Sequence, residues 1–457
     1  MRKTMISRRD FLSQSILGAA ALSAPGWAEA LGEAKTTTKP NIVYILCDDL
    51  GYGDLSCCGH PIIQTPCLDA LAQEGIKLTD GYAAAPVCSP SRAGIMTGRT
   101  PTRCRIMDWI PPKSGVYLKR EEITIASLLK ASGYATAHIG KWHLNSVMNG
   151  SEPSPGDHGF DEWLSTQNNA IPSHRDPINF LRNGQPEGKR EGFSSAIIVD
   201  ESLRFLRRVK DRPFALFVWF HSPHEPIATA DEFQEMYASV KDENEAIYYG
   251  NVSQMDHEAG RLLKALDEMN LRDNTFVMFA SDNGPETYMR YKTALYSHGS
   301  PGALRGMKLH MHEGGYRIPG IIRWPGKSQS AAVCSEPVNG TDVLPTLCEI
   351  AGIEPPTDRI IDGASIAPIF HNKSIHRQRP LYWRYDNALT ESKIALRQGD
   401  WKILSDLKFE KIELYNLKND LPESLNLVDK HPQKLKEMLS QLKEIHAEVD
   451  NDPVSKG

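Results

Sequence analysis

The sequence predicts an α/β fold, in which a large N-terminal domain with a mostly parallel mixed sheet flanked by helices precedes a small α+β C-terminal domain with an antiparallel sheet. Three observations carry this prediction. Short apolar runs alternate with helical patterns through most of the chain, and these runs are rich in β-branched and aromatic residues. After about residue 377 the pattern changes to closely spaced short strands.

Four apolar runs predict strands that are buried on both faces. They are residues 41–47, 134–139, 214–220 and 275–280. Continuous apolar runs of this length are typical of parallel strands covered by helices on both sides, whereas half-exposed strands alternate apolar and polar residues. The large domain is therefore expected to have a parallel centre.

Helical patterns lie between these runs. Residues 122–132 place Ile125, Leu128 and Leu129 on one side, and residues 252–269 repeat apolar side chains at helical spacing. Residues 150–195 are rich in Pro, Gly, Asn and Ser and lack periodicity, which predicts long surface loops.

The C-terminal part reads as a separate small sheet with one helix. Its short strands are expected at residues 381–385, 393–397, 401–404 and 413–415. Gln398-Gly399-Asp400 predicts a turn. Pro432 suits the first turn of a final helix over 432–449. We therefore expect a large domain over 31–377 and a C-terminal α+β subdomain over 378–457.

Composition excludes several classes of protein. Of the 457 residues, 40% are hydrophobic and 24% are charged, which is the balance of a globular protein and not of a disordered chain, a fibre or a polytopic membrane protein. The net charge of −5 argues against nucleic-acid binding. The eight Cys residues have no paired spacing, so neither a zinc finger nor a dense disulfide framework is expected.

The first 30 residues read as an export signal. Ser7-Arg8-Arg9-Asp10-Phe11-Leu12 precedes a modest apolar stretch over 16–22, and Ala28-Glu29-Ala30 offers a cleavage site. This order resembles a bacterial twin-arginine signal peptide over 1–30, with a short basic helix as the alternative. It implies the twin-arginine export machinery as a partner and a periplasmic or extracellular location. The apolar stretch is too short to span a bilayer, so no stable membrane insertion is expected.

Polar, reactive residues follow each of the four predicted strands. They are Asp48-Asp49, Lys141-Trp142-His143, His221-Ser222-Pro223-His224 and Ser281-Asp282-Asn283. Ligands of open α/β sheets bind at the carboxyl ends of the strands. If the strands are parallel, these side chains meet in one pocket.

Four of these residues are candidate metal ligands. Asp48, Asp49, Asp282 and Asn283 offer hard oxygen donors, which suit Ca²⁺ or Mg²⁺. Either pair alone is read more simply as a helix cap or a turn. Two such pairs at two strand ends favour a metal site.

One segment carries a family resemblance. Residues 88–99 read CSPSRAGIMTGR, and all eight specified positions match the signature of the sulfatase family: Cys-x-Pro-Ser-Arg, three free positions, Leu or Met, Thr, Gly, and Arg or Lys. Further segments resemble the family in family order: 48–54, 133–143, 221–224, 304–308, 313–315 and 413–417. The chain therefore resembles formylglycine-dependent, type I sulfatases of the alkaline-phosphatase-like superfamily, with residues 31–377 as the catalytic domain.

The resemblance implies a modified nucleophile. Cys88 matches the residue that a separate formylglycine-generating enzyme oxidises to formylglycine. One hydroxyl of the hydrated aldehyde would attack the sulfur of a sulfate ester and expel the alcohol, and the other would then drive out sulfate and restore the aldehyde. Asp48, Asp49, Asp282 and Asn283, with the modified Cys88, would hold one Ca²⁺ ion.

The other catalytic roles also come from the resemblance. Arg92 and Lys141 would hold the formylglycine hydroxyls, and His143 would take a proton from the second hydroxyl. His224 and Lys308 would bind sulfate and protonate the departing oxygen. Taken singly, Lys308 is read more simply as a surface lysine, and His143 and His224 as core or loop histidines with satisfied hydrogen bonds.

The substrate is expected to be a sulfated carbohydrate. The chain is similar to bacterial sulfatases that remove 4- or 6-sulfate from galactose or N-acetylgalactosamine units, and Trp109, His174 and Arg175 are candidate substrate-binding residues. For Arg175, an ordinary surface arginine is the alternative. Two other functions stay open: a phosphoesterase of the same superfamily, and a non-catalytic protein that binds sulfated glycans with Cys88 unmodified.

Overall fold

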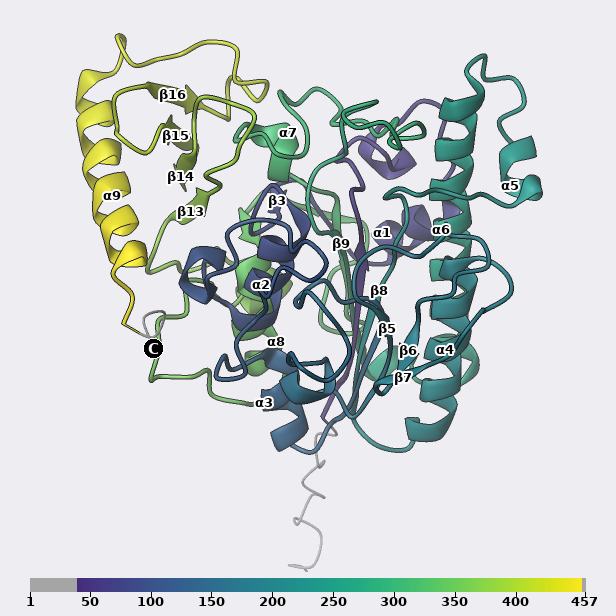
Figure 1. Cartoon of the computed structure of the whole chain (residues 1–457). Coiled ribbons are helices and arrows are strands. Elements are labelled where there is room, and N and C mark those ends of the chain that lie inside the picture. The colour runs from purple at the N-terminus through teal and green to yellow at the C-terminus, as the bar shows by residue number, and fades with distance from the viewer. Residues whose placement is uncertain (1–38, 454–457) are drawn as a thin grey trace, which may run out of the picture. The chain divides into compact units, whose positions relative to one another are not determined.

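A ten-stranded mixed sheet forms the centre of the structure, a computed structural model that describes residues 39–453 (Figure 1). In spatial order its strands are β11 (Ala332–Cys334), β2 (Ile76–Leu78), β10 (Gly320–Arg323), β9 (Thr275–Ser281), β1 (Asn41–Cys47), β8 (Phe214–Trp219), β4 (Ala135–Lys141), β5 (Glu162–Thr166), β6 (Leu181–Arg182) and β7 (Gln185–Pro186). The central strands β9, β1, β8, β4 and β5 are parallel, and antiparallel pairs flank them on both sides.

The four apolar runs predicted as strands are neighbours in this sheet. They form β9, β1, β8 and β4 in that order, and Leu46 of β1 pairs with Trp219 on one side and Ala280 on the other. Every residue of these strands is buried, since helices cover both faces. The predicted parallel centre is therefore confirmed, and the four polar strand ends lie along one edge of the sheet.

The prediction of loops throughout 150–195 is wrong in part. Residues Glu162–Thr166 form β5, which pairs in parallel with β4 and buries Trp163 and Leu164. A strand this short carries too few apolar residues to show a period of two. Pairing with a preformed neighbour decided its structure, and β6 and β7 extend the sheet as a short hairpin.

Helices pack against both faces of the sheet and enclose two separate cores. α1 (Pro66–Glu74), α4 (Ser194–Val209) and α6 (Glu243–Glu268) cover one face. α2 (Cys88–Thr97), α3 (Ile125–Ala131) and α8 (Val343–Ala351) cover the other. Alternate residues of β1 divide between the cores, because successive side chains of a strand point to opposite faces: Tyr44 joins one and Ile45 the other.

The two predicted helices exist with shifted bounds. α3 ends one residue earlier than expected, and α6 begins at Glu243, well before residue 252. The Asp242 side chain caps α6 by accepting hydrogen bonds from the backbone N–H groups of Asn244 and Glu245. The shorter elements are α5 (Asp231–Glu235), α7 (Glu313–Tyr316), β3 (Gly81–Tyr82) and β12 (Val338–Asn339).

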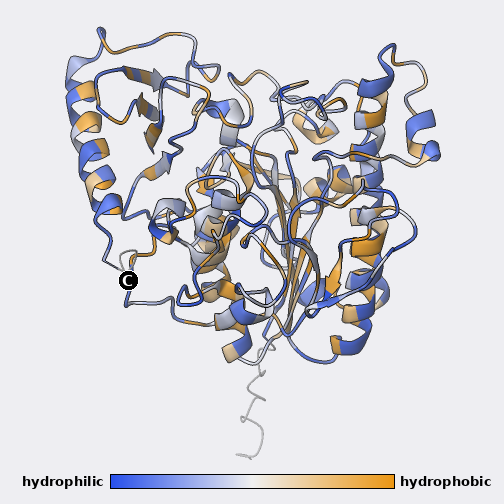
Figure 2. Ribbon diagram, viewed as in Figure 1, coloured by the Kyte–Doolittle hydropathy of each residue, from blue (hydrophilic) through white to orange (hydrophobic). Residues whose placement is uncertain are grey.

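The C-terminal part forms the predicted antiparallel sheet with one helix. The sheet consists of β13 (Leu381–Arg384), β14 (Ile394–Gln398), β15 (Trp401–Ser405) and β16 (Ile412–Asn416) in sequential order. α9 (Pro432–Asp450) places Met438, Leu442 and Val449 against it, and its apolar stripe alternates with polar residues in Figure 2. The α/β fold class with a small α+β C-terminal part is thus confirmed.

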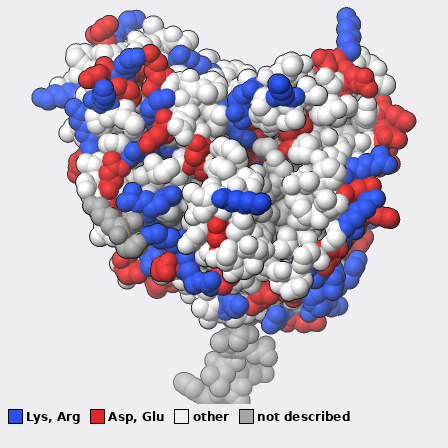
Figure 3. Space-filling view, viewed as in Figure 1, with Lys and Arg blue, Asp and Glu red and all other residues white. Residues whose placement is uncertain are grey.

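Charge is mixed on the visible surface. Lys and Arg side chains are interspersed with Asp and Glu over the face in Figure 3, so this face has no continuous basic patch. Among residues 39–453, no helix has the length and apolar character needed to cross a bilayer. The signal peptide expected over 1–30 lies outside the described residues. All eight Cys side chains are described, and all are free thiols.

Candidate active site

The polar residues that follow the central strands meet at one buried cluster. Asp48 and Asp49 follow β1, Lys141 ends β4, and Asp282 and Asn283 follow β9; all are at most 2% exposed. Lys141 Nζ donates to Asp48 Oδ2 at 2.5 Å, and the backbone N–H of Asp49 donates to Asp282 Oδ1 at 3.2 Å. The parallel arrangement of the strands is what brings these side chains together.

Helix α2 is fastened to this cluster through Arg92. Arg92 Nε and Nη2 donate to Asp282 Oδ2 at 2.9 and 2.7 Å, and Nη1 donates to the Lys141 carbonyl at 2.6 Å. The guanidinium also lies over the Trp219 ring, with Cζ 5.1 Å from its centre. Cys88 is the first residue of α2, so these contacts fix its position beside the strand ends.

Cys88 is buried, and its side chain lines a cavity together with His224 and Lys308. Burial raises the pKa of the Cys88 thiol to about 11, an effect that the positive charges of Lys141 and Lys308 partly oppose. The unmodified side chain is consequently a thiol at neutral pH, which is a weak nucleophile.

Lys308 supplies a second buried cation. Its Nζ donates to Asp49 Oδ2 at 2.7 Å and lies 3.6 Å from Glu286 Oε2. Burial alone would lower the pKa of Lys308, but the negative charges of Asp49 and Glu286 outweigh burial and hold this pKa well above its usual value. Lys308 is therefore a charged hydrogen-bond donor at the cavity.

Two histidines at the cavity are neutral. Burial lowers the pKa of His224 to about 3; its Nδ1 lies 2.5 Å from the Glu225 carbonyl oxygen, and its Nε2 lies 3.6 Å from Asp49 Oδ2. Burial also holds the pKa of His143 well below its usual value. His143 Nε2 lies 3.1 Å from the Ile110 carbonyl oxygen, and its buried Nδ1 has no hydrogen-bond partner. His143 Nδ1 is thus the nitrogen that can accept a proton.

The oxygen donors of the cluster suit a divalent cation. Asp48 Oδ1 and Asn283 Oδ1 are buried without hydrogen-bond partners, although buried polar atoms are normally satisfied. One ligand atom each from Asp48, Asp49 and His224 lie within 4.8 Å of one another. Burial raises the pKa of Asp49 to about 6 and that of Asp282 to about 7, and neighbouring carboxylates add to both shifts. A divalent cation would relieve this crowding of negative charge.

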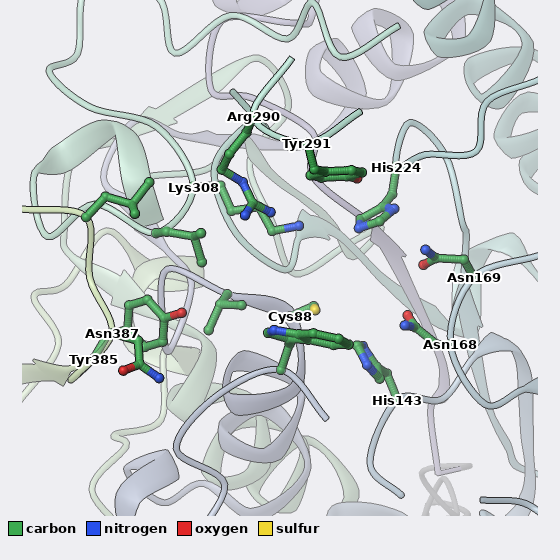
Figure 4. A pocket seen from close by; sticks show the side chains of 14 residues that line it. Cys88, His143, Asn168, Asn169, His224, Arg290, Tyr291, Lys308, Tyr385 and Asn387 are labelled. Atoms are coloured by element: carbon green, nitrogen blue, oxygen red, sulfur yellow. The ribbon is translucent and has the colours of Figure 1, made fainter. Parts of the chain in front are cut away.

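A cavity of about 540 Å³ opens in front of Cys88 (Figure 4). Its lining residues are Val87, Cys88, Trp109, His143, Asn168, Asn169, His224, Arg290, Tyr291, Lys308, Leu309, Tyr385, Asn387 and Leu389. In Figure 4, Asn168 and Asn169 lie on one side of Cys88, and Tyr385 and Asn387 from the C-terminal part lie on the other. The volume is that of a site for a small organic ligand.

The three candidate substrate-binding residues take different positions. Trp109 lines the cavity and is 43% exposed. His174 does not line it: the ring is buried, 6.2 Å from the ring of His221, and burial lowers its pKa to about 4. Arg175 is exposed and lies over the Phe193 ring, outside the cavity lining.

Sequence reasoning missed several lining residues. Tyr385, Asn387 and Leu389 lie between two C-terminal strands more than 290 residues after Cys88. No local pattern marks them, since only the packing of the C-terminal part against the large domain brings them to the cavity.

Comparison with known proteins identifies the class. Residues 40–353 match the sulfatase family, and residues 307–451 match the family described as N-sulphoglucosamine sulphohydrolase, C-terminal. The chain belongs to the sulfatase family, and the expected family and enzyme class, sulfuric ester hydrolase, are confirmed.

Individual relatives agree with this class. The chain is 31% identical to steryl-sulfatase from Rattus norvegicus over 76% of this chain and 73% of the relative, and 32% identical to N-acetylgalactosamine-6-sulfatase from Canis lupus familiaris over 83% and 76%. The solved structure of Ps i-CgsB matches with a TM-score of 0.81 and 29% identity, covering 89% of this chain and 92% of that one.

The solved structure of a phosphonate monoester hydrolase of Agrobacterium radiobacter matches with a TM-score of 0.65 and 20% identity. The match covers 90% of this chain and 96% of that one, and it shows a shared fold alone. The phosphoesterase alternative gains no further support from it.

Proposed function

We propose that this sulfatase removes sulfate from a sulfated carbohydrate, a 4- or 6-sulfated galactose or N-acetylgalactosamine unit, with formylglycine at position 88 and one Ca²⁺ ion. The observation that carries the proposal is the position of Cys88, which shares one cavity with His224 and Lys308 beside the buried carboxylate cluster.

The residues that would hold the ion are Asp48, Asp49, Asp282 and Asn283, together with the modified residue 88. Their support is the hard-oxygen chemistry of the set and the two buried oxygens that accept no hydrogen bond, Asp48 Oδ1 and Asn283 Oδ1. When bound, Ca²⁺ would supply a Lewis acid at a sulfate oxygen, and formylglycine would supply a hydrated aldehyde as nucleophile.

The chain's own residues would orient and stabilise the reacting groups. Arg92 and Lys141, held against Asp282 and Asp48, would place positive charge beside residue 88. His143 would accept a proton at Nδ1, which has no partner. Lys308 would donate a hydrogen bond to the departing ester oxygen, where negative charge develops.

The carbohydrate part of the proposal has two supports. One named relative is an N-acetylgalactosamine-6-sulfatase, and Ps i-CgsB has been solved in complex with k-i-k-neocarrahexaose. The cavity wall also carries the side-chain amides of Asn168, Asn169 and Asn387, which can hydrogen-bond to sugar hydroxyls. The formylglycine-generating enzyme and the twin-arginine export machinery would be partners during maturation, and the enzyme would act in the periplasm or outside the cell.

A single set of assays tests the reaction. The protein is produced with a formylglycine-generating enzyme, and release of sulfate is measured from 4- and 6-sulfated galactose and N-acetylgalactosamine, with an aryl sulfate and an aryl phosphate alongside. Mass analysis of the peptide that contains residue 88 should show the aldehyde. We expect sulfate release from at least one sugar, faster than phosphate release, and none from Cys88→Ala. Sulfate release by Cys88→Ala would refute the assignment of residue 88 as the nucleophile.

The metal is tested by content as well as by rate. Asp282→Asn removes a charged ligand, so we expect the bound Ca²⁺ measured by elemental analysis to fall from one ion per chain to a small fraction. Asp256→Asn is the matched control, because Asp256 is also buried and instead accepts hydrogen bonds from the backbone of Cys67 and Leu68. Full Ca²⁺ content in Asp282→Asn would contradict the ligand set.

A further inference from the structure

The side chain of Asp108 ties two distant loops together at the rim of the cavity. Its Oδ1 accepts hydrogen bonds from the backbone N–H of Trp109 at 2.7 Å and from Tyr385 Oη at 2.9 Å. Its Oδ2 accepts from Asn387 Nδ2 at 2.6 Å. One carboxylate thus holds the segment that carries Trp109 and the loop between β13 and β14.

Both loops are also anchored next to catalytic candidates. The backbone N–H of Ile110 donates to Ser89 Oγ at 3.1 Å, and the Ile110 carbonyl contacts His143. On the other side, the backbone N–H of Leu389 donates to the carbonyl of Leu309, the residue after Lys308, at 2.9 Å. The positions of Trp109 and Asn387 are therefore fixed relative to the reacting groups.

The groups presented to the cavity have unused binding capacity. Trp109 is 43% exposed, although large aromatic side chains are usually well buried. Asn387 is exposed and uses Nδ2 on Asp108, which leaves its carbonyl oxygen for a ligand. On the opposite side, Asn168 Oδ1 is buried without a hydrogen-bond partner. An exposed indole and two amides on opposite sides of one cavity suit a ring with C–H faces and hydroxyl edges.

We propose that Trp109, Asn387 and Asn168 bind the sugar ring that carries the sulfate, and that Asp108 is a positioning residue for the first two. This inference rests on the proposed function and adds the residues that recognise the sugar. A sterol would leave the buried Asn168 Oδ1 without a hydrogen-bond partner, which is costly, so these residues favour a hydroxylated ring over a sterol.

Binding to an inactive protein separates sugar recognition from sulfate recognition. In a Cys88→Ala background, the affinity is measured by calorimetry for inorganic sulfate and for the 4- and 6-sulfates of galactose and N-acetylgalactosamine, whichever of them the active enzyme turns over. Adding Trp109→Ala or Asn387→Ala should weaken binding of the sugar sulfate by roughly tenfold or more, because each removes about 1.4 kcal/mol or more of contact with the ring. Binding of inorganic sulfate should change less than about twofold, since that anion makes no contact with the wall.

Asp108 and a matched aromatic residue complete the test. In the active enzyme, Asp108→Ala should raise KM for the sugar sulfate by roughly tenfold with a much smaller change in kcat. Asp108→Asn should reverse part of this rise in KM, because its amide oxygen still accepts the hydrogen bonds from the Trp109 backbone N–H and Tyr385 Oη, whereas the acceptor for Asn387 is lost. Tyr288→Ala is the control, since Tyr288 is 46% exposed on a nearby loop but does not line the cavity.

Two outcomes would overturn the proposal. One is unchanged binding of the sugar sulfate in Trp109→Ala and Asn387→Ala. The other is an equal loss of inorganic sulfate and sugar sulfate, which would mean that the wall only supports the sulfate site. Neither result depends on residue 88, whereas a failure of the proposed function would appear as absent sulfate release by the unsubstituted enzyme.

Discussion

Single residues at the site form a row of alternating charges. Asp49 contacts Lys308, Lys308 lies near Glu286, and Glu286 accepts two hydrogen bonds from Arg290 at 2.7 and 2.8 Å. Burial alone would raise the pKa of Glu286, but Lys308 and Arg290 lower it to about 2. The carboxylates of Asp49 and Glu286 keep Lys308 charged, and their contacts hold its side chain at the cavity.

Replacement of Lys308 separates catalysis from stability. Lys308→Met should lower kcat about 100-fold or more, because the departing oxygen loses its charged donor. It should also destabilise the fold, since Asp49 and Glu286 lose a buried partner. Lys402→Met is the matched control: Lys402 is a buried lysine between two carboxylates that does not line the cavity. Equal kcat values for the two folded variants, measured well below their melting temperatures, would contradict the catalytic role of Lys308.

At the scale of elements, β4 reaches the site through a glycine. Gly140 has a φ of +117° and pairs with Trp219 of β8. A Cβ at this position would lie 1.8 Å from the Trp219 carbonyl oxygen, which no side chain tolerates without a shift of the backbone. The close approach of β4 and β8 places Lys141 beside Asp48.

Substitution of Gly140 therefore tests the geometry of the strand. Gly140→Ala should cost about 3 kcal/mol or more in the free energy of unfolding, because a steric clash adds to an unfavourable backbone conformation. Gly133→Ala is the control, since Gly133 has a φ of +87° with nothing within 4 Å of the added Cβ, and it should cost only about 1–2 kcal/mol. Denaturant unfolding measures the free energy of unfolding of both variants. Equal losses in the two would show that the added Cβ at position 140 does not clash with the Trp219 carbonyl oxygen.

At the scale of the described residues 39–453, charged side chains join the small sheet to the large domain. Lys402 of β15 is buried and donates to Glu313 of α7 at 2.8 Å, and it lies 2.7 Å from Glu423. Arg397 of β14 contacts Asp80, which also contacts Arg317. This junction ties β14 and β15 to the large domain.

Loss of the central cation should weaken the whole fold. Lys402→Met leaves Glu313 and Glu423 buried without their shared partner and should lower the free energy of unfolding by about 3–5 kcal/mol. Lys411→Met is the control, because Lys411 and its partner Glu391 are 58% and 70% exposed, and an exposed pair contributes about 0–1 kcal/mol. A melting temperature of Lys402→Met equal to that of Lys411→Met would show that the junction contributes little.

The sequence by itself determined the four central strands, the strands and helix of the C-terminal part, and the family. Long apolar runs mark buried parallel strands wherever burial is complete, and the signature over 88–99 marks the family, because both signals are local in the chain. The sequence did not predict β5, because this short segment becomes a strand only by pairing with β4.

Only the tertiary structure decided which of the candidate residues line the cavity and which distant residues join them. Trp109 lies within it while His174 and Arg175 do not, and Tyr385 and Asn387 reach it from the far end of the chain. The physical reason is that a cavity wall is made by packing between distant segments, and no period or motif within one segment records which other segment it will meet.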